Sequence, residues 1–515
     1  MKNKMIIMLI ILSTASAYAQ SYKIDSSFGI NGIQHLMTSR ELAGIAVRPN
    51  NDIVLCGYNN VPQSMNYQLA VNALKFAGQI DISFGIQGNA TTWFDSLTYA
   101  YDCAIQADGK IIAVGTYSSG NTPIAPAVHH AFVVRYFASG TIDSSFGSNG
   151  IVLVNAGDEC NFAKVKILPN GKILAAGNIQ NGATFRYLLV QFNSSGNYDL
   201  NFGNGGMVTT LFPHEAGLWD LDILQDGSII ASGNEGPYDP SPNPNFDIQM
   251  CMIKYSSAGI VDSNFGTNGI VYLNMDPYTD DVIHNLHEQS DGKLIATGVG
   301  NNQGVIARFL SDGTIDSTYD GDGIKSVGHV TRISVLQQND KLVTANNYLN
   351  GAGQDIELVR YNVDASLDTT FGINGTINHD VPGTNNYIQN AALDNLNNII
   401  VCGSSDSGSI VARYSLTANG PAAVLPLEND IPQISIYPNP VSNELYCVLN
   451  AKSAQTVQIQ LLNMNGEVMS TNLIQPTLGG QATKYWLPVS DLISGRYVIK
   501  MMTADRTEIR SFIKL

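Results

Sequence analysis

A short box of residues recurs along most of the chain and limits what the chain can fold into. The box reads Asp-x-x-Phe-Gly-x-x-Gly or close to it. Its copies are Asp25–Gly32, Asp81–Gly88, Asp143–Gly150, Asp199–Gly206, Asp262–Gly269, Asp316–Gly323 and Asp368–Gly375. In the sixth copy, Tyr319 and Asp320 replace the Phe-Gly pair. Successive boxes begin about 57 residues apart, which indicates an array of similar structural repeats.

Two other elements recur in phase with the box. One is a turn followed by a short apolar strand, as in Asp108-Gly109-Lys110 and the run that ends at Gly115. The other is an apolar strand that ends in Arg-Tyr or a similar pair, as at Arg135-Tyr136. Each period holds four strand-length runs, and no window shows a sustained helical period. Four strands in each of seven repeats predict an all-β chain built on a seven-bladed β-propeller.

The two ends of the repeat array are out of phase with each other. The last repeat stops after its third strand, near Leu416, with no box after it, whereas the array starts with just such a box at Asp25. We therefore expect residues 32–36 to supply the outermost strand of the last blade and to pair with residues 410–414. Such closure would remove the free sheet edges that promote aggregation.

The repeats resemble the delta-60 repeat family of bacterial surface and secreted proteins. The resemblance covers residues 21 to 416 and is carried by the Phe-Gly boxes and the Asp-Gly-Lys turns, which follow each other in order. It implies a propeller. It implies no general catalytic activity and no cofactor.

The first 19 residues have the pattern of a signal peptide. Lys2 and Lys4 give a positive start, residues 5–12 are apolar, and Ala17-Tyr18-Ala19 resembles a cleavage site. No later apolar run reaches 18 residues, so we expect an exported chain without a membrane span.

The pattern changes after the propeller, which we assign to residues 20–420. Residues 421–433 are rich in proline and acidic residues, as in a linker. Residues 434–515 alternate between apolar and polar residues, and polar turns separate these stretches, which predicts a small β-sandwich.

This C-terminal stretch is similar to the type A sorting domain of the type IX secretion system of Bacteroidota. The residues that carry the similarity are Tyr437, Pro438, Asn439, Pro440, Gly495, Tyr497 and Lys514. The resemblance implies two partners, the type IX secretion machinery and a surface sortase that removes the domain. It implies a protein that is released from the cell or attached to its outer surface.

Charge excludes several function classes. The chain has 27 Lys and Arg residues against 43 Asp and Glu residues, a net charge of −16. Binding to nucleic acid or to an anionic membrane needs clustered basic residues. The six cysteines include no CxxC pair, which excludes a zinc ribbon, and we find neither a Walker loop nor a GxSxG elbow.

Several small motifs have two interpretations each. Cys56 and Cys402 precede the repeat glycine in blades that would be neighbours, so they are either a disulfide or two small buried side chains. Residues 320–323 are either a calcium loop or a turn. His129-His130 and the pair His284 and His287 are either metal ligands or structural residues. The Asp of each box is expected to cap the backbone of its own turn.

The loops favour one end of the propeller as a binding surface. The Asp-Gly turns and the Phe-Gly boxes should share one end, and the irregular loops should share the other; these loops are residues 58–68, 116–130, 213–218, 234–247 and 275–281. At the first position of the innermost strands stand Ala43, Tyr101, Ala163, Trp219, His284, Arg332 and Gln389. Among these, Tyr101, Trp219, His284 and Arg332 either rim the channel mouth and suit a sugar or peptide ligand, or belong to ordinary blade packing.

Three functions are compatible with these patterns. The leading hypothesis is a non-enzymatic binding or adhesion protein of the cell surface or medium, with a glycan or protein ligand. The alternative is a hydrolase or lyase that acts on extracellular polysaccharide. A structural component of a surface layer is the third.

Overall fold

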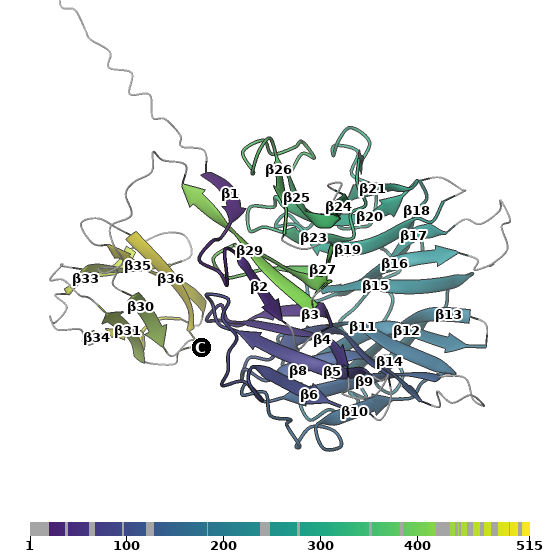
Figure 1. The fold of residues 1–515 in the computed structure, drawn as a ribbon, viewed down its shortest axis with the longest axis horizontal. Coiled ribbons are helices and arrows are strands. Elements are labelled where there is room, and N and C mark those ends of the chain that lie inside the picture. Colours follow the sequence, from purple (N-terminus) through teal and green to yellow (C-terminus); the bar gives the residue numbers. More distant parts are fainter. Residues whose placement is uncertain are drawn as a thin grey trace, which may run out of the picture. The chain divides into compact units, whose positions relative to one another are not determined.

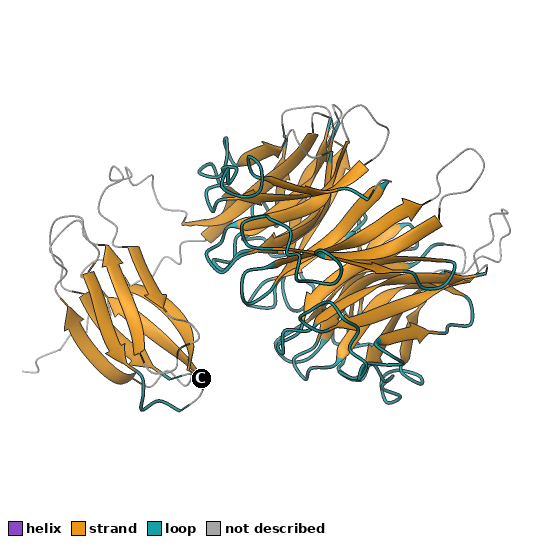
Figure 2. Ribbon diagram, turned by 90° about the horizontal axis from the view of Figure 1, so that it is seen from below, coloured by secondary structure: helices purple, strands orange, loops and turns teal. Residues whose placement is uncertain are grey.

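Both units of the protein consist of strands and loops in the computed structural model (Figure 2). The structure describes residues 20–36, 40–60, 67–94, 97–119, 128–182, 184–236, 248–275, 279–349, 353–381, 385–406, 408–418, 433–437, 441, 444–450, 457–463, 468–474, 483–493, 495–502 and 507–514. The chain divides into two compact units, Met1–Asn419 and Gly420–Leu515. In the described residues, no helix is long and apolar enough to cross a membrane.

The described residues of the first unit form seven antiparallel sheets, which we number by their position in the chain (Figure 1). Sheet 1 contains β3 (Glu41–Val47), β4 (Ile53–Asn60), β5 (Tyr67–Leu74) and β6 (Asn89–Thr92). Sheet 2 contains β7 (Thr98–Ile105), β8 (Ile111–Ser119), β9 (Val128–Tyr136) and β10 (Ile151–Val154). Sheet 3 contains β11 (Glu159–Ile167), β12 (Ile173–Asn181), β13 (Thr184–Phe192) and β14 (Met207–Thr210). Sheet 4 contains β15 (Glu215–Ile223), β16 (Ile229–Gly236), β17 (Gln249–Tyr255) and β18 (Ile270–Leu273).

The remaining sheets of this unit follow the same order. Sheet 5 contains β19 (Val282–Glu288), β20 (Leu294–Gly300), β21 (Gln303–Phe309) and β22 (Ile324–Val327). Sheet 6 contains β23 (Ile333–Leu336), β24 (Leu342–Leu349), β25 (Gln354–Tyr361) and β26 (Thr376–His379). Sheet 7 contains β27 (Asn386–Leu393), β28 (Ile399–Ser405), β29 (Gly408–Ala418), and two N-terminal strands, β1 (Gln20–Ile24) and β2 (Ile33–Leu36).

The first strand of each sheet lies innermost. Each of these strands contacts the first strand of the next sheet, and β27 of sheet 7 contacts β3 of sheet 1, so the contacts close into a ring. The apolar core is correspondingly divided into clusters between neighbouring sheets. The cluster between sheets 7 and 1, for example, joins Ile400 and Val411 to Leu42 and Leu55. The all-β propeller that the sequence predicts is thus confirmed.

Sheet 7 is completed by the N-terminus. Ile33–Leu36 of β2 pairs with Ser409–Ala412 of β29, the pairing expected from the phase of the repeats. The structure adds a second strand, since Gln20–Ile24 of β1 pairs with Tyr414–Ala418 further along β29 (Figure 1). Both N-terminal strands are therefore hydrogen-bonded to β29, the last strand of the propeller chain.

Each box caps its own turn, as the sequence predicts. In all seven copies, the carboxylate of the box Asp accepts a hydrogen bond from the backbone N–H two residues later, for example from Ser27 to Asp25 at 3.0 Å. The Phe-Gly pair then reaches the next sheet. Gly29 donates its N–H to the carbonyl of Ala77 at 2.8 Å, and a Cβ on Gly78 would lie 2.9 Å from the ring of Phe28.

An arginine strengthens this box in four of the described sheets. The Nε atoms of Arg135, Arg308, Arg360 and Arg413 lie 2.8–2.9 Å from the Asp of their own box. Each guanidinium also lies over the box aromatic ring, 4.4–4.8 Å from its centroid. Arg308 extends the link to the next sheet, because its Nη1 donates to the carbonyl of Val363 at 2.6 Å. The sequence analysis did not predict this ion pair.

The sixth box forms a turn. Asp322 accepts the N–H of Ile324 at 2.9 Å, and Lys325 lies 3.3 Å from Asp320. Tyr319 takes the place of Phe beneath Arg308.

Cys56 and Cys402 are both buried and free of a disulfide in this structure.

The second unit is a β-sandwich. One sheet contains β30 (Gln433–Tyr437), β31 (Glu444–Asn450) and β34 (Thr483–Pro488). The other contains β33 (Val468–Ile474), β32 (Val457–Leu462), β35 (Gly495–Met502) and β36 (Thr507–Lys514). Leu445 and Leu487 from one sheet share a core with Ile459, Ile499 and Phe512 from the other.

The box ion pair should make a measurable contribution to stability. Burial alone would raise the pKa of Asp316, but hydrogen bonds from Thr318 and the charges of Arg308 and Lys293 lower this pKa to about 2. Relative to the ordinary value of 3.8, this shift corresponds to about 2 kcal/mol of stability at neutral pH. We expect Asp316→Asn to lower the free energy of unfolding by about that amount, measured by urea denaturation at pH 7.

The matched control is Asp262→Asn. Asp262 caps its turn in the same way, but the described residues place no Lys, Arg or His side chain within 4 Å of it. Because the pKa of Asp316 is lowered in the folded state, its contribution is present above pH 4 and is lost as the pH falls towards 2. The difference in the free energy of unfolding between the unsubstituted protein and Asp316→Asn should therefore shrink as the pH falls from 4 towards 2. Equal effects of the two substitutions at pH 7 would contradict this role of the ion pair.

Candidate functional site

The two ends of the propeller differ in their chemistry. The first-to-second-strand turns and the boxes occupy one end, because strands alternate in direction within each sheet. The other end, which we call the loop end, contains the starts of the first and third strands and the ends of the second strands. Parts of its loops, residues 61–66, 120–127, 237–247 and 276–278, lie outside the described residues.

A β-bulge near the loop end skips one residue in six of the seven innermost strands described. The register shifts between Leu218 and Asp220 in β15, and similar shifts occur in β3, β7, β11, β19 and β27. The residues skipped by these shifts are Ala43, Tyr101, Ala163, Trp219, His284 and Gln389. They are the residues that the sequence places first in the innermost strands, and Arg332 stands at the matching point before β23.

Trp219, His284 and Arg332 form one group, which we call the mouth site. The rings of Trp219 and His284 meet edge to face, with centroids 5.1 Å apart. The indole Nε1 of Trp219 donates to Oδ1 of Asn234 at 2.9 Å, yet 48% of the Trp219 surface is exposed. Burial lowers the pKa of His284 to about 4, and the positive charges of Arg332 and Lys164 act in the same direction. His284 is therefore neutral at pH 7.

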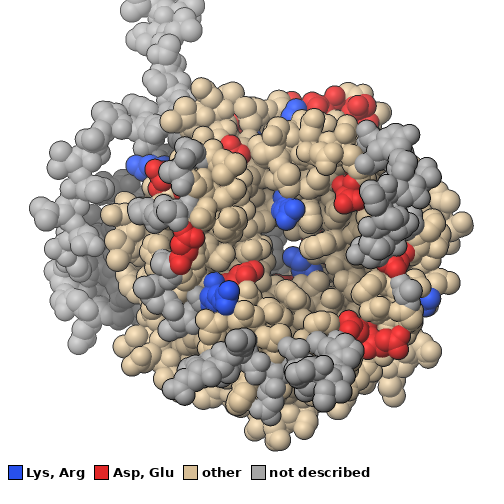
Figure 3. All heavy atoms as spheres, turned by 45° about the vertical axis from the view of Figure 1, so that its right-hand side comes forward, with Lys and Arg blue, Asp and Glu red and all other residues tan. Residues whose placement is uncertain are grey.

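A polar channel lies beneath the bulge residues. It has a volume of about 540 Å³ and is lined by the middle parts of the innermost strands. Lys166 and Asp222 form an ion pair at 3.0 Å inside it, and Lys164 lies 3.6 Å from Asp220. Asp220 also accepts the N–H of Leu286 in the next sheet at 2.8 Å. Figure 3 shows Lys and Arg side chains at the edge of a central opening on one face.

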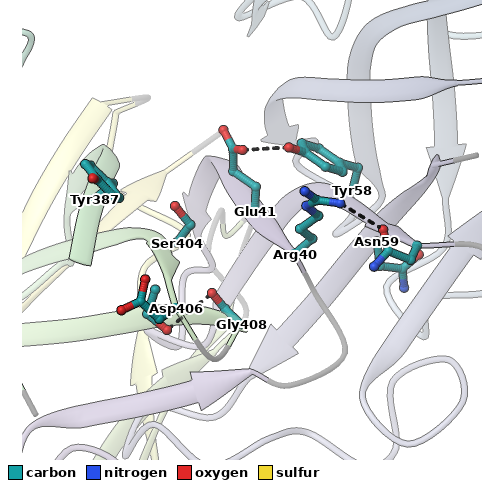
Figure 4. A pocket seen from close by; sticks show the side chains of 10 residues that line it. Arg40, Glu41, Tyr58, Asn59, Tyr387, Ser404, Asp406 and Gly408 are labelled. Carbon is teal, nitrogen blue, oxygen red and sulfur yellow. Dashed lines mark hydrogen bonds between the residues drawn. The ribbon is translucent and has the colours of Figure 1, made fainter. Parts of the chain in front are cut away.

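A larger pocket lies at the loop end between sheets 7 and 1 (Figure 4). Its volume is about 640 Å³. Its lining residues are Arg40, Glu41, Tyr58, Asn59, Asn60, Tyr387, Ser404, Ser405, Asp406 and Gly408. Tyr387, Ser404 and Asp406 face Glu41 and Tyr58 across the pocket in Figure 4.

Hydrogen bonds fix the orientation of several pocket side chains. The hydroxyl of Tyr58 donates to Glu41 at 2.7 Å, and Nη1 of Arg40 donates to the hydroxyl of Tyr67 at 3.0 Å. The rings of Tyr58, Tyr67 and Tyr99 lie 4.9–5.5 Å from one another, and the Arg40 guanidinium lies 5.2 Å from the Tyr67 centroid.

Two smaller pockets continue from this tyrosine cluster. The first has a volume of about 280 Å³, is lined by Tyr99 and Tyr101, and extends to Glu159 and Phe185. The second has a volume of about 210 Å³; it shares Phe185, Asn161 and Asn178 with the first and reaches Glu215 and Asn234. We call these three pockets together the outer groove. Asn234 joins the groove to the mouth site, because it accepts the Trp219 indole N–H.

The candidate residues from the sequence thus fall into two places. Trp219, His284 and Arg332 come together, whereas Tyr101 lines the outer groove and is 39% exposed. His129 accompanies Tyr101 in that pocket, and one of its ring nitrogens lies 3.0 Å from the Ser118 hydroxyl. His287 lies 2.9 Å from Ser334. Among the described residues, no group of three or more His, Cys, Asp and Glu side chains could hold a metal ion.

The sequence analysis missed the pocket between sheets 7 and 1 and the tyrosine cluster. Tyr58 ends β4, Tyr67 begins β5 and Tyr99 belongs to the next repeat, so no single motif joins them. One signal was available: the aromatic residues are confined to a few repeats at positions where the other copies carry different residues.

Two family comparisons identify the parts of the chain. Residues 435–515 match the secretion system C-terminal sorting domain. Residues 106–146, 168–202, 289–319 and 337–371 match the β-propeller described as a domain of unknown function (DUF5122). The chain is a propeller-repeat protein with a type IX secretion sorting domain. The sorting domain directs the protein to the outer surface of the cell or to the medium, as the sequence predicts.

The structure places part of the sorting motif. Gly495 begins β35, and the buried Tyr497 donates its hydroxyl to the carbonyl of Ile493 at 2.9 Å. Lys514 is buried near the end of β36, and Tyr437 ends β30. Pro438, Asn439 and Pro440 lie outside the described residues, as do residues 1–19 and the linker up to residue 432.

Solved structures with a similar arrangement include PorZ, a surface component of the type IX secretion system of Porphyromonas gingivalis. It is 11% identical with a TM-score of 0.40, and the match covers 92% of this chain and 59% of PorZ. An α-L-arabinanase of Penicillium chrysogenum is 13% identical with a TM-score of 0.42, covering 65% of this chain and 98% of the arabinanase. No curated protein matches the chain.

The mouth site makes a prediction for His284. Its ring should titrate with a midpoint near pH 4, measured by NMR on the histidine-labelled protein, because burial and two nearby cations disfavour its charged form. Arg332→Gln should raise that midpoint. Lys325→Gln, on the outermost strand β22, removes one positive charge at a different place and should leave the midpoint of His284 unchanged. A midpoint near 6.5 that is insensitive to Arg332→Gln would contradict the geometry of the site.

Proposed function

We propose that the propeller is a non-enzymatic binding protein for extracellular polysaccharide, presented at the cell surface or in the medium by its sorting domain. The single observation that carries this proposal is the half-exposed Trp219. Its indole is held by Asn234 on one side and by His284 on the other, so it presents a rigid aromatic surface at the loop end. Exposed aromatic side chains whose orientation is already fixed bind with little loss of conformational entropy.

The outer groove supports an extended ligand. Its three pockets run from sheet 7 to sheet 4 and combine tyrosine rings with amide, hydroxyl and carboxylate groups. Such groups match the apolar faces and the hydroxyl groups of sugar rings. The continuity of the groove with Trp219 through Asn234 favours several sugar units over one.

Binding is tested by replacing Trp219 with Ala in the propeller. Affinity for a polysaccharide that binds the unsubstituted protein should fall about 10- to 100-fold, the loss expected for an aromatic residue at the centre of a contact. The measurement is calorimetric titration against a panel of neutral and charged polysaccharides. The control is Trp93→Ala, since Trp93 is 52% exposed just after the outermost strand β6.

Two outcomes would contradict the proposal. Unchanged affinity in Trp219→Ala, with an unchanged melting temperature, would remove Trp219 from the binding surface. New reducing or unsaturated ends after incubation with the unsubstituted protein would favour the hydrolase or lyase alternative.

We also propose that a surface sortase removes the C-terminal sandwich after signal peptidase has removed residues 1–19. The surface protein should then lack β36 and its Phe512-Ile513-Lys514 ending. A chain that ends at Gly420 should accumulate in the periplasm of a Bacteroidota host. Mass spectrometry of the surface protein and of the periplasmic chain identifies the C-terminus of each. An intact C-terminus on the surface protein would contradict processing.

A further inference from the structure

The mouth site carries an uncompensated positive charge. Arg332 is exposed, and in the described part of the chain no carboxylate lies within 4 Å of it. The positive charges of Arg332 and Lys164 both act on His284. Asp220 lies 3.6 Å from Lys164 and partly neutralises it, whereas no ion pair among the described residues neutralises Arg332.

The outer groove has the opposite character. Its pockets contain four carboxylates, those of Glu41, Asp406, Glu159 and Glu215, against one guanidinium, that of Arg40, so their net charge is negative. None of these four carboxylates lies within 4 Å of a described Lys, Arg or His side chain. Among the described residues, Glu41 accepts a hydrogen bond from Tyr58 and Asp406 accepts one from Asn385, and both donors are neutral. A negative charge on a ligand would be repelled in the groove and attracted at the mouth.

We propose that the mouth site binds an anionic sugar unit, and that the groove binds the uncharged units that follow it. This inference rests on the proposed polysaccharide function and names its ligand class: a polymer with spaced carboxylate or sulfate groups. The sugar ring would stack on Trp219, and its anionic group would accept hydrogen bonds from Arg332. A planar guanidinium suits both carboxylate and sulfate, because its N–H groups match pairs of oxygen atoms.

The charge of the whole protein makes this preference specific. A net charge of −16 repels polyanions at long range, so the preference can arise only from local contacts. Fully charged polymers should bind less well than sparsely charged ones, because their neighbouring charges would meet Glu41, Glu159 and Glu215.

The test uses the full propeller and two matched pairs of polymers. One pair is homogalacturonan with a few free carboxylates and its fully methyl-esterified form. The other pair is lightly sulfated dextran and dextran. The unsubstituted protein should bind the charged member of one or both pairs at least 10-fold more tightly, and the pair that shows the preference identifies carboxylate or sulfate as the anionic group.

Variants separate this inference from the proposed function. Arg332→Gln should abolish the preference and leave the affinity for the neutral polymer, whereas Trp219→Ala should weaken both. Lys325→Gln on β22 removes one positive charge from an outermost strand and should keep the preference. Thermal melting of each variant confirms that it is folded.

Several results would overturn the inference. These are equal affinity for both members of each pair, a preference that survives in Arg332→Gln, and absence of binding to any of the four polymers. Binding of a neutral polymer that depends on Trp219 but shows no charge preference would overturn the inference and leave the proposed function standing.

Discussion

The propeller depends on one repeated contact, in which the box of one sheet is joined to the turn of the next. A box Asp holds its own turn, the Phe-Gly pair docks on the neighbouring sheet, and in four of the described sheets an Arg links the Asp and the aromatic ring. Glycine is favoured at the second position of the pair because φ is positive there, as at Gly29, and in the sixth box Asp320 adopts the same conformation. One local motif thus fixes both the turn and the spacing between sheets.

This separation of the two ends explains why the proposed binding surface lies at the loop end. The boxes and their partners determine the packing at one end, so the opposite end is free to differ from repeat to repeat. The bulges place residues as different as Ala43, Trp219 and His284 at equivalent points of the innermost strands. The scaffold stays the same while the chemistry at the channel mouth changes.

The sequence predicted the repeated parts of the fold well. The box capping, the all-β propeller and the use of residues 32–36 to complete the last sheet all follow from motifs that recur at fixed spacing. β1 was not predicted, because no other repeat has a free strand in that place. The link between Arg413 and Asp25, 388 positions apart, was also missed, as were the equivalent pairs Arg308–Asp316 and Arg360–Asp368, which are 8 positions apart.

The site was predicted only in part, for a physical reason. A residue's place in a repeat gives its place on the innermost strand, so the sequence singles out Trp219, His284 and Arg332 as candidates, and the structure brings these three together. The first pocket of the outer groove is created when ring closure brings Tyr387 and Asp406 from the end of the array next to Glu41 and Tyr58 from its beginning. The spacing and the residue types within one repeat do not show which residues of distant repeats become neighbours.

Ring closure by the N-terminal strands is the central claim, and removing residues 20–36 tests it most directly. The shortened chain lacks β1, β2 and the box that binds Arg413, so amide hydrogen exchange should accelerate in β29 and in sheet 1, and the whole propeller should unfold at a lower urea concentration. Adding a peptide of residues 20–36 should restore the exchange protection. Unchanged protection in β29 and sheet 1 without the peptide would contradict the account.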